Sequence, residues 1–226
     1  MTADAKRYEL AYFAWSGMAE PCRAILHYLE ADWKDVSYSF DQWPGLKDHQ
    51  PGSGNGEPTL ELAESTAIER YLANQGALRG ATDAEAVLID SYRASMTDTL
   101  ARLSKYRFFL GGDDEQMAEL RAGYLKAAEE LVKFHERVLA RNGGGNGHYV
   151  GDRLSVADVT LAIIMGQAET VGLEAPFAAE AAPLMHKVYD AAVAHPRLAA
   201  YWADARERFR RESGGYQGGD FDLKKR

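Results

Sequence analysis

Strand-like patterns are confined to the first eighty residues of this chain, and this uneven distribution constrains the fold more than any other feature. Residues 8–14 (YELAYFA) form a short run rich in aromatic and aliphatic side chains, and residues 36–40 (VSYSF) alternate. Between these runs, Cys22, Ile25 and Leu29 recur at helical spacing, as on one buried face. A strand, a helix and a strand in this order predict a parallel strand pair with a crossover helix.

The segment after these elements closes a small α/β unit. Residues 50–56 (QPGSGNG) contain too much glycine for regular structure, and residues 59–62 (TLEL) predict a further short strand. A helix is expected to begin at Ser65 and to stop at Gly76. We therefore assign residues 5–79 to an α/β domain.

The remainder of the chain has no strand pattern of any length. Apolar residues at helical spacing predict five helices, with Pro196 in the first turn of the last one. We expect an all-α domain over residues 80–213 and a mobile tail over residues 214–226. The predicted helices lie near residues 88–103, 117–139, 155–170, 183–194 and 196–209.

Charge and cysteine content exclude several classes of partner. The chain carries 26 Lys and Arg against 34 Asp and Glu, a net charge of −8, whereas nucleic-acid binding depends on clustered cations. The single cysteine, Cys22, allows no internal disulfide and suits a reducing compartment. The six histidines lack ligand spacing, and no apolar run is long enough to span a membrane. We expect a cytoplasmic protein with a small-molecule ligand and without a metal, nucleic-acid or membrane partner.

Four short segments match a known pattern. They are Tyr12–Phe13 with residues 17–23 (GMAEPCR), residues 43–47 (WPGLK), residues 63–72 (AESTAIERYL) and residues 154–158 (LSVAD). Together they resemble the cytosolic glutathione S-transferases, and in particular the sigma-like members of the tyrosine type. The resemblance extends over about residues 8–209. It implies an α/β thioredoxin-like N-terminal domain, an all-α C-terminal domain, a homodimer, and glutathione as substrate or cofactor.

The resemblance also implies a catalytic group. Tyr12 stands where the tyrosine-type classes carry a hydrogen-bond donor to the glutathione sulfur, which favours the nucleophilic thiolate. Ser16 is the alternative donor, although a turn residue beside Gly17 is the simpler interpretation. Cys22 lies within the predicted helix and is interpreted as a small buried residue.

Glutathione-binding residues follow from the same resemblance. Ser65 is expected to cap its helix, whose free N–H groups would receive the γ-glutamyl carboxylate, while Glu64 would face the ammonium group. Trp43 and Lys47 would hold the glycine carboxylate. Pro58, or alternatively Pro51, would be the cis-proline beside the cysteinyl backbone. Asp98 would contact glutathione across the dimer interface.

The electrophile is expected to bind between the two domains. The residues assigned to this site are Trp15, Met18, Leu100, Leu103 and Tyr106. Ser155 and Asp158 resemble a capping box and are assigned to folding rather than catalysis.

The chain departs from the family in two places. Only the five residues Thr59–Ala63 separate Pro58 from Glu64, too few for two strands and a turn, so the third strand is lost or replaced. Met18 stands where sigma-like enzymes often have an arginine, which makes the surroundings of Tyr12 more apolar. The leading hypothesis is a detoxifying glutathione transferase that attacks small apolar electrophiles. The alternatives are a catalytically weak binding or structural relative and a dedicated glutathione-dependent isomerase.

Overall fold

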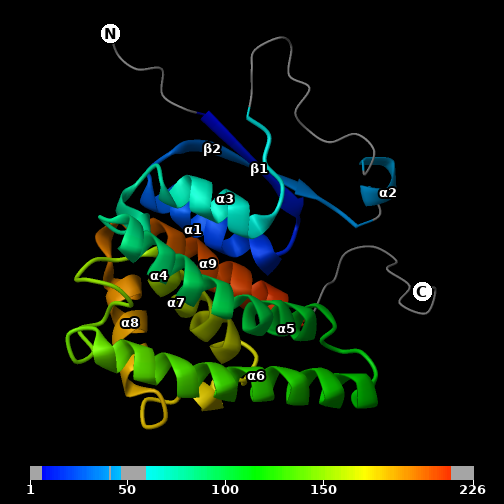
Figure 1. Cartoon of the computed structure of the whole chain (residues 1–226). Helices are drawn as coiled ribbons and strands as arrows, with labels where there is room; N and C mark the ends of the chain where they lie inside the picture. The colour runs from blue at the N-terminus through cyan, green and yellow to red at the C-terminus, as the bar shows by residue number, and fades with distance from the viewer. Residues whose placement is uncertain (1–6, 41, 47–59, 215–226) are drawn as a thin grey trace.

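A computed structural model describes residues 7–40, 42–46 and 60–214 and contains a small strand-bearing layer stacked on a bundle of helices (Figure 1). Pro51, Pro58, Lys47 and the expected tail beyond Gly214 lie outside these residues. The elements are, in chain order, β1 (Arg7–Phe13), η1 (Gly17–Ala19), α1 (Glu20–Tyr28), β2 (Asp32–Tyr38), α2 (Trp43–Leu46), α3 (Ser65–Ala73), η2 (Ala77–Arg79), α4 (Asp83–Ser95), α5 (Thr97–Phe108), α6 (Asp114–Arg141), α7 (Val156–Glu169), η3 (Ala175–Phe177), α8 (Pro183–Ala194), η4 (Pro196–Leu198), α9 (Ala199–Arg211) and η5 (Glu212–Gly214).

The two strands pair in parallel, with Arg7 opposite Asp32 and Phe13 opposite Tyr38, which confirms the predicted strand–helix–strand unit. Helix α1 makes the crossover and packs against α3 on one side and against α7 and α9 on the other. The strand predicted at Thr59–Leu62 is wrong for the residues described, because Leu60–Leu62 form no strand. Leu60 and Leu62 are 64% and 40% exposed, so no neighbouring strand covers them.

The long helix predicted over residues 88–103 is instead two helices, α4 and α5, that meet at Met96. The Ser95 hydroxyl donates to the Tyr92 carbonyl oxygen at 2.7 Å, and Arg93 reaches the Thr97 hydroxyl at 3.2 Å. A hydroxyl bonded back to its own helix competes with the backbone ladder and bends the helix. The apolar pattern continues through this bend because Met96 itself is fully buried, so periodicity gave no sign of it.

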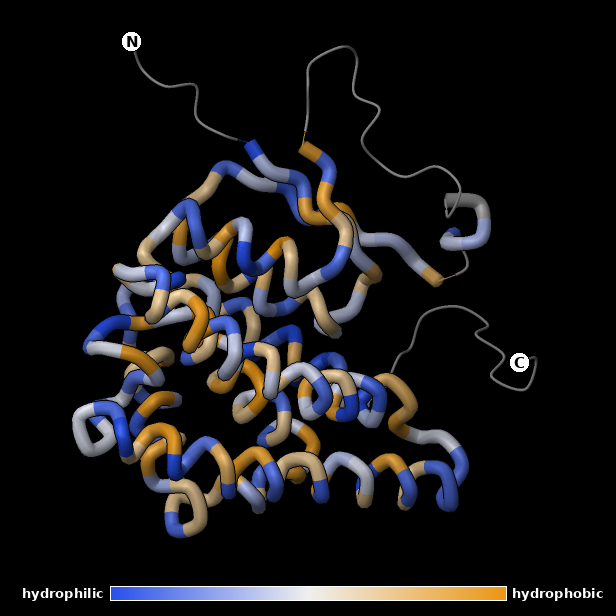
Figure 2. Tube along the Cα trace, viewed as in Figure 1, coloured by the Kyte–Doolittle hydropathy of each residue, from blue (hydrophilic) through white to orange (hydrophobic). Residues whose placement is uncertain are grey.

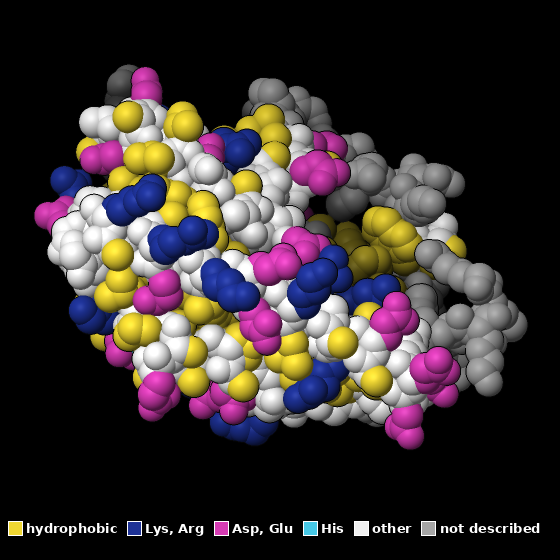
Figure 3. Space-filling model, turned by 60° about the horizontal axis from the view of Figure 1, so that its bottom comes forward, with side chains coloured by type: hydrophobic (Ala, Val, Ile, Leu, Met, Phe, Trp, Pro, Cys, Tyr) yellow, Lys and Arg dark blue, Asp and Glu magenta, His cyan; other side chains and the backbone are white. Residues whose placement is uncertain are grey.

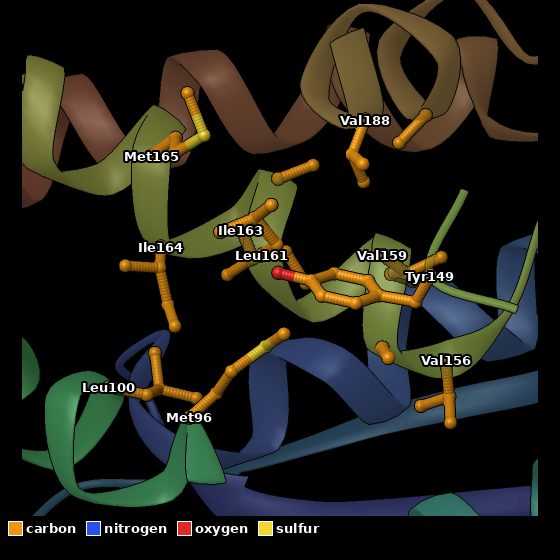
Figure 4. Close-up of a cluster of buried hydrophobic side chains, with 14 of the residues drawn as sticks. Met96, Leu100, Tyr149, Val156, Val159, Leu161, Ile163, Ile164, Met165 and Val188 are labelled. Carbon is orange, nitrogen blue, oxygen red and sulfur yellow. The ribbon is translucent and has the colours of Figure 1, made fainter. Parts of the chain in front are cut away.

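Helix α7 forms the centre of the bundle. Every residue from Val156 to Met165 is buried, and Met96, Leu100, Tyr149 and Val188 pack around it (Figure 4). The predicted capping box is confirmed: Asp158 accepts from the Ser155 N–H and hydroxyl, and the Ser155 oxygen accepts from the Asp158 N–H. Asp158 also accepts from the Tyr149 N–H at 2.8 Å, which fixes the preceding loop to the start of α7.

Helix α6 supplies the outer wall and is amphipathic along its length, as the alternating colours of Figure 2 show. Its buried residues Tyr124, Ala128, Leu131 and Val138 recur at intervals of three, four or seven residues, as one helix face requires. The other predicted helices are confirmed, with the difference that the segment at Pro196 begins as the 3-10 turn η4 before α9. We propose that the boundary between the two domains follows residue 79.

A buried carboxylate joins the strand-bearing layer to the bundle. Glu20 of α1 is fully buried and accepts from Arg23 at 3.1 Å, from the Tyr201 hydroxyl at 3.1 Å and from Arg208 of α9. Arg23 also donates to Asp35 of β2 at 2.7 Å. Burial alone would raise the pKa of Glu20, but Arg208 and Arg23 hold this pKa below its usual value. The carboxylate therefore stays charged and joins α1 to α9, while Arg23 links α1 to β2.

Buried His135 predicts a pH dependence of stability. Its ring lies between the Ser95 and Tyr149 hydroxyls, and burial lowers its pKa from 6.5 to about 4. Unfolding exposes the ring, so the unfolded chain binds this proton first and stability falls as pH drops from about 6.5 toward 4. We expect this group to remove about 2 kcal/mol between pH 8 and pH 5.

Urea denaturation of the wild type and of His135→Gln across this range measures the effect. The variant is less stable at pH 8 but is expected to lose less stability on acidification. Equal pH slopes for the two proteins would contradict the assignment.

Candidate functional site

A cavity of about 310 Å³ lies where the C-terminal ends of β1 and β2 face α5. In the space-filling view, hydrophobic side chains are visible in a hollow at the right of the molecule (Figure 3). The lining is strongly aromatic, as in sites for small apolar molecules. It comprises Tyr12, Phe13, Trp15, Met18, Phe40, Ala101, Ser104, Lys105, Phe108 and Phe109.

Tyr12 lines this cavity, and its hydroxyl lies against the backbone of Gly17 and Met18. The Met18 N–H donates to the Tyr12 oxygen at 3.2 Å, and no acceptor for the Tyr12 proton lies among the described residues. A phenol can accept and donate at the same time, so the backbone contact orients the oxygen and leaves its proton for a ligand. Tyr12 is therefore a hydrogen-bond donor aimed by the main chain.

Gly17 makes this geometry possible. Its φ is +45°, and a Cβ atom at this position would lie 2.7 Å from the Tyr12 hydroxyl oxygen. Any larger side chain would be strained in its backbone and would also displace the phenol. The glycine therefore permits the close approach of the loop to the tyrosine.

The far end of the chain holds the same loop in place. Glu212 accepts from the Ser16 N–H at 2.9 Å and from Arg107 of α5 at 3.1 Å. The Arg107 guanidinium lies over the rings of Trp15 and Phe209, 5.6 and 5.4 Å from their centroids. Ser16 is fully buried. A carboxylate from the last turn thus fixes the loop that carries Trp15 and Met18 into the cavity.

Aromatic contacts extend the site from Tyr12 toward α2. Phe13 stacks on Phe40 with a centroid distance of 4.0 Å, and Trp43 packs edge-on against Phe13 at 5.3 Å. Trp43 is 37% exposed, so its indole remains within reach of a ligand. Tyr12 and Trp43 therefore lie in one cluster, although they are far apart in sequence.

The start of α3 offers free backbone donors. The expectation that Ser65 caps this helix is wrong: Glu64 occupies the N-cap, and no side chain caps the helix. The Ala67 and Ile68 N–H groups both donate to the Glu64 carbonyl, whereas those of Ser65 and Thr66 have no acceptor among the described residues. Uncapped donors at a helix start suit an anionic group.

Glu64 has an unusual backbone, with φ of 70° and ψ of 111°. Left-handed φ values in residues other than glycine are costly and cluster at functional sites. The exposed Glu64 side chain is thereby placed at the start of α3. Cys22 lies behind this point, with its sulfur 3.7 Å from the Ser65 carbonyl oxygen, and burial raises the pKa of the thiol. The interpretation of Cys22 as a buried residue is confirmed.

Several residues assigned from the sequence lie elsewhere. Leu100 and Leu103 are fully buried in the core, and Tyr106 packs against this core, so none of the three lines the cavity. Asp98 is exposed and pairs with Arg102 at 2.7 Å. Trp15 and Met18 do line the cavity.

Sequence reasoning chose the wrong face of α5. The cavity is lined by the adjacent stripe, in which Ala101, Ser104, Lys105 and Phe108 recur at spacings of three, four and seven residues from the first. This helical spacing could have identified the cavity-lining stripe, but Leu100 and Leu103 were assigned because they are more hydrophobic. The two leucines fill the core, and the less hydrophobic stripe lines the cavity.

Among the described residues, no group of three or more His, Cys, Asp and Glu side chains could hold a metal ion. None of their helices has both the length and the apolar character needed to cross a membrane.

A thioredoxin-like layer with a main-chain-oriented tyrosine, facing a helical bundle across an aromatic cavity, defines a class of proteins built from two such layers. Residues 98–205 match the family model "Glutathione S-transferase, C-terminal domain". The chain is 32% identical over 164 residues to the Caenorhabditis elegans protein "Probable glutathione S-transferase 6", covering 68% of this chain and 76% of that protein.

Two further relatives extend over nearly the whole chain. Glutathione S-transferase P 1 of Xenopus laevis is 29% identical over 213 residues, covering 89% of this chain and 94% of that protein. The structure of a Nu-class GST from Haemonchus contortus is 26% identical, with a TM-score of 0.69, covering 88% of this chain and 97% of the other. This protein belongs to the glutathione S-transferase family.

The contact between Glu212 and the loop predicts that Glu212→Ala is strongly destabilising. The substitution leaves the buried Arg107 charge and the Ser16 N–H unpaired, which costs about 3 kcal/mol. Urea denaturation followed by tryptophan fluorescence measures this loss and also monitors Trp15.

Glu207→Ala is the matched control, because Glu207 pairs with Arg210 on the surface, where both side chains are more than half exposed. We expect this control to change stability by less than about 0.5 kcal/mol. Similar losses for the two variants would contradict the proposed role of Glu212.

Proposed function

We propose that this protein conjugates glutathione to small apolar electrophiles and that Tyr12 activates the thiol. The observation that carries the proposal is the Tyr12 hydroxyl, which is oriented by the Met18 N–H, lines the cavity and has a proton free for donation. Membership of the glutathione S-transferase family supports glutathione as the thiol substrate.

The proposed mechanism uses the tyrosine as an electrostatic stabiliser. A hydrogen bond from the Tyr12 O–H to the sulfur favours the thiolate and lowers the thiol pKa. The thiol proton passes to solvent, the sulfur forms a bond to the electrophilic carbon, and the bond from this carbon to its leaving group breaks, with the leaving group departing with the bonding pair. Trp15, Met18 and Phe108 surround the electrophile and exclude water, which strengthens the interaction of the phenol with the charged sulfur.

Glutathione is proposed to lie along the line from α3 to α2. The free N–H groups of Ser65 and Thr66 would receive the γ-glutamyl carboxylate, with the Glu64 carboxylate facing the ammonium group. Trp43 and Lys47 would hold the glycine carboxylate, and Pro58 or Pro51 the cysteinyl backbone. These last contacts rest on the sigma-like resemblance, because Lys47 and both prolines lie outside the described residues.

The assembly and location of the protein belong to the same proposal. We propose a cytoplasmic homodimer in which Asp98 of one protomer approaches the glutathione of its partner. The exposed position of Asp98 leaves it accessible for such a contact. With a domain boundary after residue 79, the proposed glutathione contacts other than Asp98 belong to the first domain, and both domains contribute residues to the electrophile cavity.

A second candidate function is that of a binding or structural protein with weak catalytic activity. It is favoured by the sheet, in which β1 and β2 are the only strands within residues 7–40, 42–46 and 60–214. Loss of the strand edge beside the cysteinyl group would weaken glutathione binding. Isothermal titration calorimetry separates the two candidates: detectable glutathione binding at millimolar concentration supports the enzyme, and its absence supports the alternative.

Replacement of Tyr12 by phenylalanine tests the mechanism. The variant keeps the ring in the aromatic cluster but removes the donor to the sulfur. We expect kcat/KM for glutathione and chlorodinitrobenzene to fall by about 100-fold, as for loss of one stabilising donor.

Tyr38→Phe is the control, since Tyr38 lies opposite Phe13 in the sheet and does not line the cavity. Its activity should stay within about twofold of the wild type. Wild-type activity in Tyr12→Phe would disprove the role of Tyr12, whatever the result for Tyr38.

A further inference from the structure

The cavity contains a charge that an apolar substrate does not need. Of the described residues that line it, Lys105 alone carries a charge, and the others are aromatic, aliphatic or hydroxyl-bearing. Lys105 lies in the last turn of α5, on the stripe shared by Ala101, Ser104 and Phe108. This stripe is the part of α5 that faces Tyr12 across the cavity.

Lys105 differs from the two arginines on the same helix. Arg102 is paired with Asp98 at 2.7 Å, and Arg107 is paired with Glu212 at 3.1 Å. Lys105 has no carboxylate within ion-pair distance in the part of the chain that the structure describes. Its ammonium group is therefore available for an anionic ligand.

The surroundings strengthen such a contact. Phe40, Phe108 and Phe109 form apolar walls around the cavity, and Trp15 packs edge-on against Phe108 at 5.6 Å. A ligand that fills this volume displaces water, and charges interact more strongly where water is excluded. An apolar molecule with one anionic end would thus bury its body against the rings and pair its charge with Lys105.

We propose that Lys105 makes this cavity selective for acidic electrophiles, meaning aromatic or aliphatic electrophiles that carry a carboxylate. The inference rests on the proposed function and names the substrate class of the same site. Lysine acts here as a point charge on a flexible stem, so it accepts carboxylates attached to bodies of different shape. Tyr12 and Lys105 then have separate tasks: Tyr12 stabilises the sulfur, and Lys105 holds the electrophile.

Chlorodinitrobenzoate and its methyl ester form a matched pair of probes. In both, the glutathione sulfur forms a bond to the ring carbon that carries chlorine, and chloride leaves with the bonding pair of the C–Cl bond. The thiol proton goes to solvent. The two probes differ in the carboxylate charge, so the ratio of their kcat/KM values reports the selectivity.

Lys105 is exposed, so we expect Lys105→Gln to lower the acid-to-ester ratio by about threefold to fivefold, mainly through a higher KM for the acid, as loss of one solvent-accessible ion pair predicts. Lys105→Glu should lower the ratio further, because it places like charges together. Raising the salt concentration should reduce the preference of the wild type for the acid. Lys126→Gln, an exposed lysine on α6, is the control and should leave the ratio unchanged.

A binding measurement separates this inference from the proposed function. Dinitrobenzoate and its methyl ester lack the leaving group, and quenching of tryptophan fluorescence reports their binding, since Trp15 lines the cavity. Tighter binding of the acid in the wild type but not in Lys105→Gln supports the inference even if neither reactive probe is conjugated. Equal acid-to-ester binding ratios in the wild type and Lys105→Gln would overturn it.

Discussion

Two buried carboxylates, Glu20 and Glu212, hold the strand-bearing layer and the helical bundle in a fixed relation. Glu20 binds Arg23 of its own helix together with Tyr201 and Arg208 of α9. Glu212 binds the Ser16 main chain and Arg107 of α5. Burying a charge is costly unless it is paired, so each contact is retained only while both layers keep this arrangement.

The position of the cavity follows from these contacts. The loop after β1 is tied to both carboxylates: the Ser16 N–H donates to Glu212, and Arg23 of α1, which pairs with Glu20, donates to the Trp15 and Ser16 carbonyl oxygens. Within this loop, Gly17 lets the Met18 N–H reach the Tyr12 oxygen. The hydroxyl is therefore held by the backbone of a loop that the opposite end of the chain secures. In such an arrangement the donor needs little reorganisation when a sulfur anion forms.

Local patterns in the sequence predicted the elements that depend on short-range interactions. The parallel pair β1–β2, the capping box at Ser155 and the helices of the bundle follow from periodicity and capping. The break at Met96 was missed because the apolar pattern continues through it, with Met96 itself fully buried. On α5, the sequence assigned Leu100 and Leu103 to the cavity, whereas the adjacent residues Ala101 and Ser104 line it. Glu212 lies 196 residues from Ser16, and no local pattern could connect them.

The central claim is that this geometry turns a bound thiol into a thiolate. Ultraviolet absorbance titration of the glutathione complex measures the pKa of the bound thiol directly. The account predicts a pKa about one to two units below that of free glutathione in the wild type, and a return to the free value in Tyr12→Phe. A bound thiol with the pKa of free glutathione in the wild type would contradict the account.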